Sequence, residues 1–133
     1  GEVWCWGVNL KGGLGDGSTT ASAVPVAASG VSGATSVAAG TWHTCAVLGD
    51  GSARCWGDNS ESQAGQPAGP NQLLPVTVDG LSGAVQASAD LRNSCAVRTD
   101  ATVRCWGDNS QGQLGTGTTA DRHRADQPVV TVR

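Results

Sequence analysis

The cysteines are the residues of this chain whose type and spacing could do chemistry. Four of the five form two pairs with ten residues from the first member to the second, Cys45 with Cys55 and Cys95 with Cys105. Zinc sites usually take ligands two to four residues apart within one knuckle, and this spacing with no second pair nearby does not fit. The sequence therefore favours disulfides over a metal site, with reduced core cysteines as the third interpretation.

Each cysteine pair lies within a segment that predicts a β-hairpin. The run HTCAVLGDGSARCWGDN, residues 43–59, returns as NSCAVRTDATVRCWGDN, residues 93–109. If residues 49–51 form the loop of the first hairpin, Cys45 faces Cys55, and a loop of residues 99–101 likewise places Cys95 opposite Cys105. Directly opposed antiparallel residues have Cα atoms about 4.5 to 5.5 Å apart, a separation that a disulfide accepts. We predict two cross-strand disulfides, each contributing roughly 3 kcal/mol in the chain-entropy model.

The fifth cysteine is the odd one. The run VWCWGVN, residues 3–9, matches the second half of the hairpin, so Cys5 corresponds to Cys55 and Cys105. Its partner would lie ten residues earlier, before residue 1, and we expect Cys5 to be unpaired or intermolecular. We also expect the chain to be a fragment of a longer array. Persistent disulfides belong to oxidising compartments, which predicts a secreted, periplasmic or cell-surface protein.

The elements that position the cysteines recur every fifty residues. Further short strands are predicted at residues 25–28, 36–39, 75–78, 86–89 and 128–132, with proline opening the first, third and fifth. Leu14, Ala64 and Leu114 occupy equivalent places, where we expect each to fill a small core beneath a loop. Four short strands in about fifty residues is the period of propeller blades. We predict an all-β fold, a partial β-propeller of about two and a half four-stranded antiparallel blades. It spans residues 1–133, in units of approximately 1–30, 31–80 and 81–133.

Composition narrows the classes of function. The 133 residues carry a net charge of −3, which argues against nucleic acid as a partner, because phosphate binding needs a clustered basic face. No apolar run approaches the roughly 20 residues of a membrane span. The Gly-rich run GGLGDG lacks the lysine and the following helix of a phosphate loop. The sequence predicts no cofactor.

Few polar residues form a candidate site. His43 has no nucleophile near it, so we interpret it as a hydrogen-bonding residue of the repeat. Residues 58–60 and 108–110 begin like a calcium loop but have no glutamate at the twelfth position, and turn stabilisation is the better interpretation. Positions at which the units differ are the ones that could contact a partner: Trp42, Arg92, Arg122, His123 and Arg124.

Three runs carry a family resemblance. CWGVNLKGGLGDG, CWGDNSESQAGQ and CWGDNSQGQLGTG, together with AAGTWHTCAVLGDG, resemble the repeats of the regulator of chromosome condensation family. The variant with paired cysteines is similar to the extracytoplasmic bacterial members. The resemblance implies a ring of about seven four-stranded blades whose rim and side loops bind proteins. The founding members are exchange factors for a small GTPase and bind chromatin, and secreted relatives include protein inhibitors of β-lactamases. No motif in this chain transfers either activity.

These observations predict a non-enzymatic scaffold for a protein partner, in a secreted or surface-displayed propeller. One alternative is a carbohydrate-binding module, with Trp42 as the stacking group and the Asn and Asp loops as hydrogen-bonding groups. The other is a nucleotide exchange factor in a reducing compartment, which requires free thiols. The open blade edges and Cys5 also offer routes to self-association.

Overall fold

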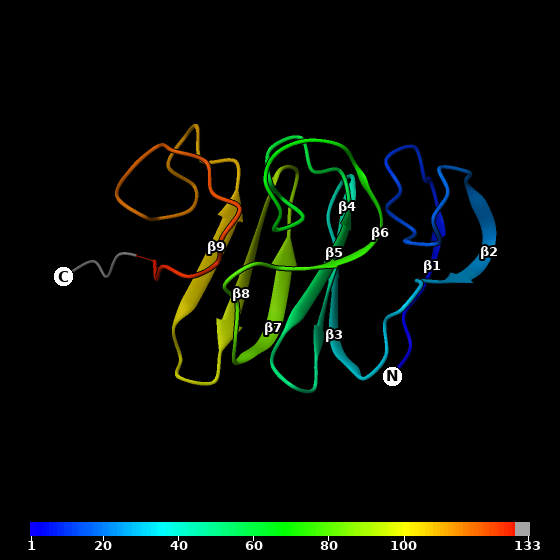
Figure 1. The fold of residues 1–133 in the computed structure, drawn as a ribbon, viewed down its shortest axis with the longest axis horizontal. Coiled ribbons are helices and arrows are strands. Elements are labelled where there is room, and N and C mark those ends of the chain that lie inside the picture. The colour runs from blue at the N-terminus through cyan, green and yellow to red at the C-terminus, as the bar shows by residue number, and fades with distance from the viewer. Residues whose placement is uncertain (130–133) are drawn as a thin grey trace.

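The computed structural model describes residues 1–129, and within them the chain forms nine strands in three antiparallel sheets. The sheets stand side by side in a row, with the N-terminus beside one end and the last described residues beside the other (Figure 1). We call them blades 1, 2 and 3. Blade 1 holds β1 (Trp4–Gly7) and β2 (Ser22–Ala27); blade 2 holds β3 (Ala34–Ala39), β4 (His43–Leu48), β5 (Ala53–Gly57) and β6 (Gln72–Thr77); blade 3 holds β7 (Ala84–Ala89), β8 (Asn93–Arg98) and β9 (Val103–Gly107).

The hairpin register is the one that the sequence predicts. β4 pairs with β5 so that Cys45 lies opposite Cys55, and β8 pairs with β9 so that Cys95 lies opposite Cys105. The tight loop of the first hairpin requires a left-handed residue, and Gly51 supplies it with φ +82°. Ala101 takes the same place in the second hairpin with φ +63°, a conformation that is strained for a residue with a Cβ.

The predicted starts of four strands are wrong, because each strand begins two or three residues earlier than expected. The strands expected to open with Pro25 and Pro75 begin three residues earlier, at Ser22 and Gln72, so that each proline lies inside its strand. This is tolerated because β2 and β6 are edge strands, where a missing N–H breaks no ladder bond. β3 and β7 likewise begin two residues earlier than predicted, because the pairing of each with the next strand shifts register near its start.

Within residues 1–129, the fourth strand of blade 3 is represented by two bridges. Pro128 pairs with Arg104 and Arg122 pairs with Gly107, both antiparallel, along the free edge of β9. The predicted strand at residues 128–132 therefore begins with a bridge at Pro128, and residues 130–132 lie outside the described residues.

The core lies between blades, because each sheet carries apolar residues on both faces. Cys45, Cys55 and Val47 of blade 2 pack against Trp106 and Ala87 of blade 3. On the other face of blade 2, Trp56 and Ala46 pack against Val3 of blade 1. The Cys45–Cys55 disulfide of blade 2 therefore faces blade 3. Trp56 of blade 2 faces blade 1, and Trp106 of blade 3 faces blade 2. Leu14, Ala64 and Leu114 are buried, as predicted.

In blades 1 and 2, one backbone carbonyl of the outer loop accepts two hydrogen bonds from the next blade. The carbonyl of Gly13 accepts hydrogen bonds from Trp56 Nε1 at 2.8 Å and from Thr44 Oγ1 at 2.9 Å. Fifty residues on, the carbonyl of Gln63 accepts from Trp106 Nε1 and from Ser94 Oγ, both at 3.0 Å. Because the two donors come from adjacent strands, this double contact fixes how neighbouring blades sit against each other.

Candidate functional site

Both predicted cysteine pairs lie at disulfide distance. The Sγ atoms are 2.11 Å apart in the Cys45–Cys55 pair and 2.07 Å apart in the Cys95–Cys105 pair. Cys5 has no such partner among the described residues, and burial raises the pKa of its thiol. Across residues 1–129 there is no cluster of three or more side chains suited to a metal ion. The same residues include no helix long and apolar enough to span a membrane.

One asparagine organises the outer loop of each blade. The side-chain oxygen of Asn9 accepts from the amide of Leu14, and its nitrogen donates to the carbonyls of Ser18 and Thr20. Asn109 repeats this arrangement, and Asn59 repeats it with one carbonyl, that of Pro67; both are fully buried. The asparagines therefore belong to the loop framework. Their buried amides are already bonded within the loops, which weakens the carbohydrate alternative.

His43 lies buried between blades 2 and 3. Its Nε2 is 2.8 Å from Ser94 Oγ, and because that hydroxyl donates to the carbonyl of Gln63, His43 Nε2 must be the donor. The imidazole Nδ1 is buried without a hydrogen-bond partner. Burial lowers the pKa of His43 to about 4, against the opposing influence of Asp58 and Asp90. The side chain is a neutral structural donor, as the sequence predicted.

Trp42 and Arg92 occupy equivalent positions in blades 2 and 3. The carbonyl of Trp42 accepts from the amide of Asp58, and the carbonyl of Arg92 accepts from the amide of Asp108, both at 2.9 Å. Both side chains are exposed, Trp42 just before β4 and Arg92 just before β8. The backbone at this position is thus fixed while the side chain changes from blade to blade.

Acidic residues contact the basic cluster near the C-terminus. Asp126 pairs with both Arg122, at 2.7 Å, and Arg124, at 2.9 Å. His123 Nε2 is 3.8 Å from a carboxylate oxygen of Asp79, which follows the last strand of blade 2. This last contact ties the C-terminal segment to the preceding blade, and the role of the cluster in binding a partner stays a prediction.

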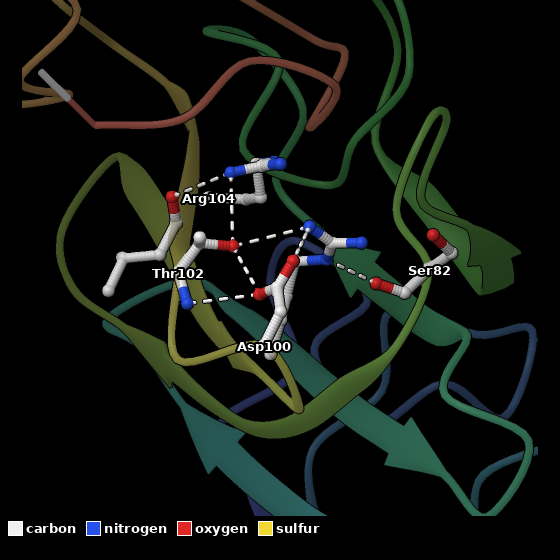
Figure 2. Close-up of polar contacts among 6 residues, drawn as sticks. Ser82, Asp100, Thr102 and Arg104 are labelled. Carbon is white, nitrogen blue, oxygen red and sulfur yellow. Dashed lines mark hydrogen bonds and ion pairs between the residues drawn. The ribbon is translucent and has the colours of Figure 1, made fainter.

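The loop between β8 and β9 carries a denser polar network (Figure 2). The carboxylate of Asp100 accepts from the amide and hydroxyl of Thr102, at 3.0 and 2.6 Å, and pairs with Arg98 at 2.8 Å. The hydrogen bonds from Thr102, more than the arginine charge, lower the pKa of Asp100. Arg98 also donates to the carbonyl of Ser82 at 2.6 Å. Because Asp100 and Arg98 pair with each other and both also bond groups of the same loop or the preceding turn, we interpret the network as structural.

A groove lies between blades 1 and 2. We call it the β1–β3 groove. It has a volume of about 440 Å³. One wall is the free edge of β1, with Trp4, Cys5 and Trp6, and the other includes Val37 of β3 and the neighbouring Trp42. Sequence reasoning identified Trp42 and Cys5 but missed the other three residues. The unpaired cysteine was the available signal, because it marks a strand whose hairpin partner is not in place.

Models of the regulator of chromosome condensation (RCC1) repeat match residues 1–47 and, in a second form, residues 34–63 and 91–113. Together with the three antiparallel sheets, these matches define the chain as part of a β-propeller. The chain belongs to the regulator of chromosome condensation repeat family. Comparison with curated proteins gave no match.

Solved structures share the fold at low sequence identity. Yeast RCC1 (Prp20) with Kap60 bound is 18% identical with a TM-score of 0.85, and the match covers 98% of this chain and 33% of that chain. Prp20p from Saccharomyces cerevisiae is 18% identical at 0.86, covering 98% and 34%. Human WBSCR16 is 21% identical at 0.77, covering 94% and 33%. The chain spans about a third of the length of each of these structures.

Proposed function

We propose that this chain is part of a non-enzymatic, protein-binding propeller that works in an extracytoplasmic compartment. The observation that carries the proposal is which positions of the repeat are buried and which are exposed. Residues that recur in blades 2 and 3, such as Asn59 and Trp56, are buried and hydrogen-bonded, while exposed positions on one edge differ from blade to blade. A framework that is repeated in each unit and presents different side chains is the arrangement by which repeat proteins bind other proteins.

The variable edge has the composition of a protein interface. It consists of the residues after β1, β5 and β9 and those before β4 and β8. The exposed members include Leu10, Lys11, Trp42, Ser60, Arg92 and Gln111. Tryptophan and arginine dominate the binding energy of protein interfaces, and Trp42 retains 36% exposure beside Leu10. We therefore assign the centre of binding to Trp42 and an additional contact to Arg92.

The compartment follows from the cysteines. Two cross-strand pairs at disulfide distance would persist only where thiols are not kept reduced. Non-reducing peptide mapping of the native protein tests this directly. We expect Cys45 linked to Cys55 and Cys95 linked to Cys105, whereas free thiols at all four positions would move the protein to a reducing compartment.

Binding is tested by affinity capture from the extracellular protein fraction, followed by calorimetry with the purified captured protein. The bait variants are Trp42→Ala and Arg92→Ala. Val24→Ala and Leu74→Ala are matched controls, because these side chains are 65% and 51% exposed on the outer strands β2 and β6, away from the variable edge. We expect Trp42→Ala to weaken binding about thirtyfold or more, as for an interface hot spot, with the controls unchanged. Equal binding by all variants would refute this assignment.

The exchange-factor alternative has its own assay. The yeast structure was described together with binding to Gsp1p and histones, and the likeness to it at 18% identity is one of fold. We expect that adding the chain to a small GTPase will not accelerate the release of labelled nucleotide. If release is accelerated, and more so after the disulfides are reduced, the exchange-factor alternative is favoured instead. A glycan array separates the carbohydrate alternative, for which we expect no binding.

A further inference from the structure

Two equivalent turns, in blades 1 and 2, differ in what lies against them. The turn of residues 28–32 follows β2, and the turn of residues 78–82 follows β6. Gly30 and Gly80 have the same left-handed conformation, with φ +72° and +77°. An added Cβ at Gly80 would lie 3.0 Å from Asp126 Cβ, whereas at Gly30 it would meet nothing within 4 Å. The chain therefore covers the turn of blade 2 and leaves the turn of blade 1 open.

A segment of blade 3, residues 123–126, covers the turn of blade 2. The amide of Ala125 donates to the carbonyl of Asp79 at 2.8 Å. The Ala125 side chain is 1% exposed, within the apolar cluster that contains Leu81. His123 Nε2 lies 3.8 Å from a carboxylate oxygen of Asp79. Such a turn is thus recognised by one backbone hydrogen bond, one apolar side chain and one basic side chain beside a carboxylate.

Blade 2 has a complete outer strand, but this strand contacts blade 1 at a different place. The amide of Gly17 donates to the carbonyl of Leu73 at 3.0 Å, and the Leu73 side chain lies beside Gly12. Pro67 occupies the position of Gly17 in blade 2, and a proline has no N–H to donate. The segment of blade 3 bonds the turn of blade 2 instead. The opening at Gly30 therefore follows from the path that β6 takes over blade 1.

The open turn forms a small pocket with an unused acceptor. The pocket has a volume of about 310 Å³ and is lined by Glu2 and residues 27–32, and we call it the blade 1 turn site. Across residues 1–129 no donor bonds the carbonyl of Ser29, whose equivalent is the carbonyl of Asp79. The site therefore offers the same acceptor that Ala125 uses on blade 2.

The apolar residues of the blade 1 turn site are smaller than their counterparts in blade 2. Ala28 occupies the position of Val78, and Val31 occupies the position of Leu81. Both residues of blade 1 line the site and are 5% exposed. Smaller side chains leave room for an apolar residue larger than the alanine that blade 2 holds.

We propose that the blade 1 turn site binds an extended segment of a partner protein, in which basic residues precede an apolar residue and an acidic residue follows it. This is the order of residues 123–126. The amide of the apolar residue donates to the carbonyl of Ser29, and the acidic residue pairs with the basic residue inside the segment, as Asp126 pairs with Arg124 at 2.9 Å. Glu2 favours the basic residues by its charge. No residue of this site belongs to the variable edge, so it is a second surface of the scaffold.

The test titrates the whole isotope-labelled chain with the peptide DRHRADQ, which has the sequence of residues 121–127, and follows the backbone amides by NMR. We expect a dissociation constant of about 0.1 to 1 mM, because the site holds one apolar side chain. The amides of Ser29 and Gly30 should shift, and that of Gly80 should not. Saturable shifts at Gly80 alone would mean that the peptide only displaces the chain's own segment. That result, or no saturable shift, would overturn the proposal.

The peptide itself provides the first control. Glutamate at the place of Ala125 puts a charge against apolar residues, and we expect it to weaken binding at least tenfold. Valine at the same place should strengthen binding about threefold to tenfold, because it buries two more methyl groups in the wider site. Equal binding of the glutamate and alanine peptides would refute the site, and weaker binding of the valine peptide would refute the predicted preference.

Gly30→Asn and Gly33→Asn provide a matched pair of variants. Both glycines are left-handed, with φ +72° and +69°, and an added Cβ would meet nothing within 4 Å at either one. Asparagine tolerates this conformation better than most residues do, and equal urea unfolding would confirm that both variants fold. Only Gly30 lines the site. We expect Gly30→Asn to weaken peptide binding at least tenfold and Gly33→Asn to leave it unchanged, and equal binding by the two variants would contradict the assignment.

Two further variants separate this site from the variable edge and test its charge. Trp42→Ala should bind the peptide as the wild type does, because Trp42 does not line the site. A loss in Trp42→Ala would place the peptide on the variable edge instead and overturn the proposal. Glu2→Gln should weaken binding about threefold at low salt and have no effect at 0.5 M salt, because the charges are exposed. Unchanged binding of Glu2→Gln at low salt would refute the role of Glu2.

Discussion

The buried imidazole of His43 should make the stability of the protein fall as the pH decreases from 6.5 to 4. Burial lowers the pKa of His43 from 6.5 to about 4 in the folded protein. Between these values the unfolded chain binds a proton at this residue and the folded chain does not. Stability from the neutral imidazole is therefore complete above pH 6.5, declines as the pH falls and is lost below about pH 4.

The size of the effect follows from the shift. One pKa unit corresponds to about 1.4 kcal/mol, so lowering the pKa of His43 from 6.5 to about 4 gives a loss of about 3 kcal/mol across the window. The structure explains why protonation of His43 is unfavourable in the folded protein. Nδ1 is the nitrogen that would gain it, and Nδ1 is buried with no acceptor, while Nε2 already donates to Ser94. A charged imidazole would have to open the interface between blades 2 and 3.

The experiment compares wild type with His43→Asn by urea unfolding at half-unit steps from pH 4 to 7.5. Asparagine is the matched replacement, because Asn93 occupies this position in blade 3. At pH 7.5 the variant should be about 1 to 2 kcal/mol less stable, having lost the bond to Ser94. The difference should shrink as the pH falls, and the two stabilities should meet or cross near pH 4. Aspartates with lowered pKa lose stability at lower pH, and they are common to both proteins.

Parallel pH profiles for the two proteins would refute this reasoning. They would mean that the folded state accepts the proton on His43 as easily as the unfolded state does. An NMR titration of the His43 ring decides the point independently. We expect its midpoint near pH 4, and a midpoint near 6.5 would show that the interface opens to water.

The remaining predictions concern stability and use urea unfolding at pH 7.5. Ala101→Gly should raise the free energy of unfolding by about 1 kcal/mol by relieving the left-handed strain at φ +63°, while Gly51→Ala should lower it by about 2 kcal/mol or more, because the new Cβ would also lie 2.8 Å from an amide nitrogen of the next blade. Replacing both Cys95 and Cys105 with alanine should lower it by roughly 3 kcal/mol, and no change would indicate that the thiols were reduced. Trp106→Phe should cost about 1 to 2 kcal/mol through the lost indole hydrogen bond, and a neutral result would contradict the carbonyl contact between blades.

Repetition explains how much of the fold could be predicted from sequence. Two copies of one hairpin determined the register by counting, and the structure pairs Cys45 with Cys55 as expected. Strand starts were less predictable, because Pro25 and Pro75 look like strand openers but lie within edge strands whose N–H side faces no neighbour. An edge position depends on what the rest of the fold places beside it, and local sequence does not contain that information.

The candidate site was harder to predict for a related reason. Exposure is set by neighbours, so the similar runs containing Trp6 and Trp56 give one exposed and one buried tryptophan. The pairing of the arginines and histidine at residues 122–124 with Asp126 and Asp79 could not be predicted from the local sequence, because it depends on how this segment folds back on the preceding blade. Partner binding by these three residues stays a prediction. Asn59 was interpreted as a local turn residue, whereas its side-chain amide donates to the carbonyl of Pro67 and accepts from the amide of Ala64, and so organises the loop that follows β5.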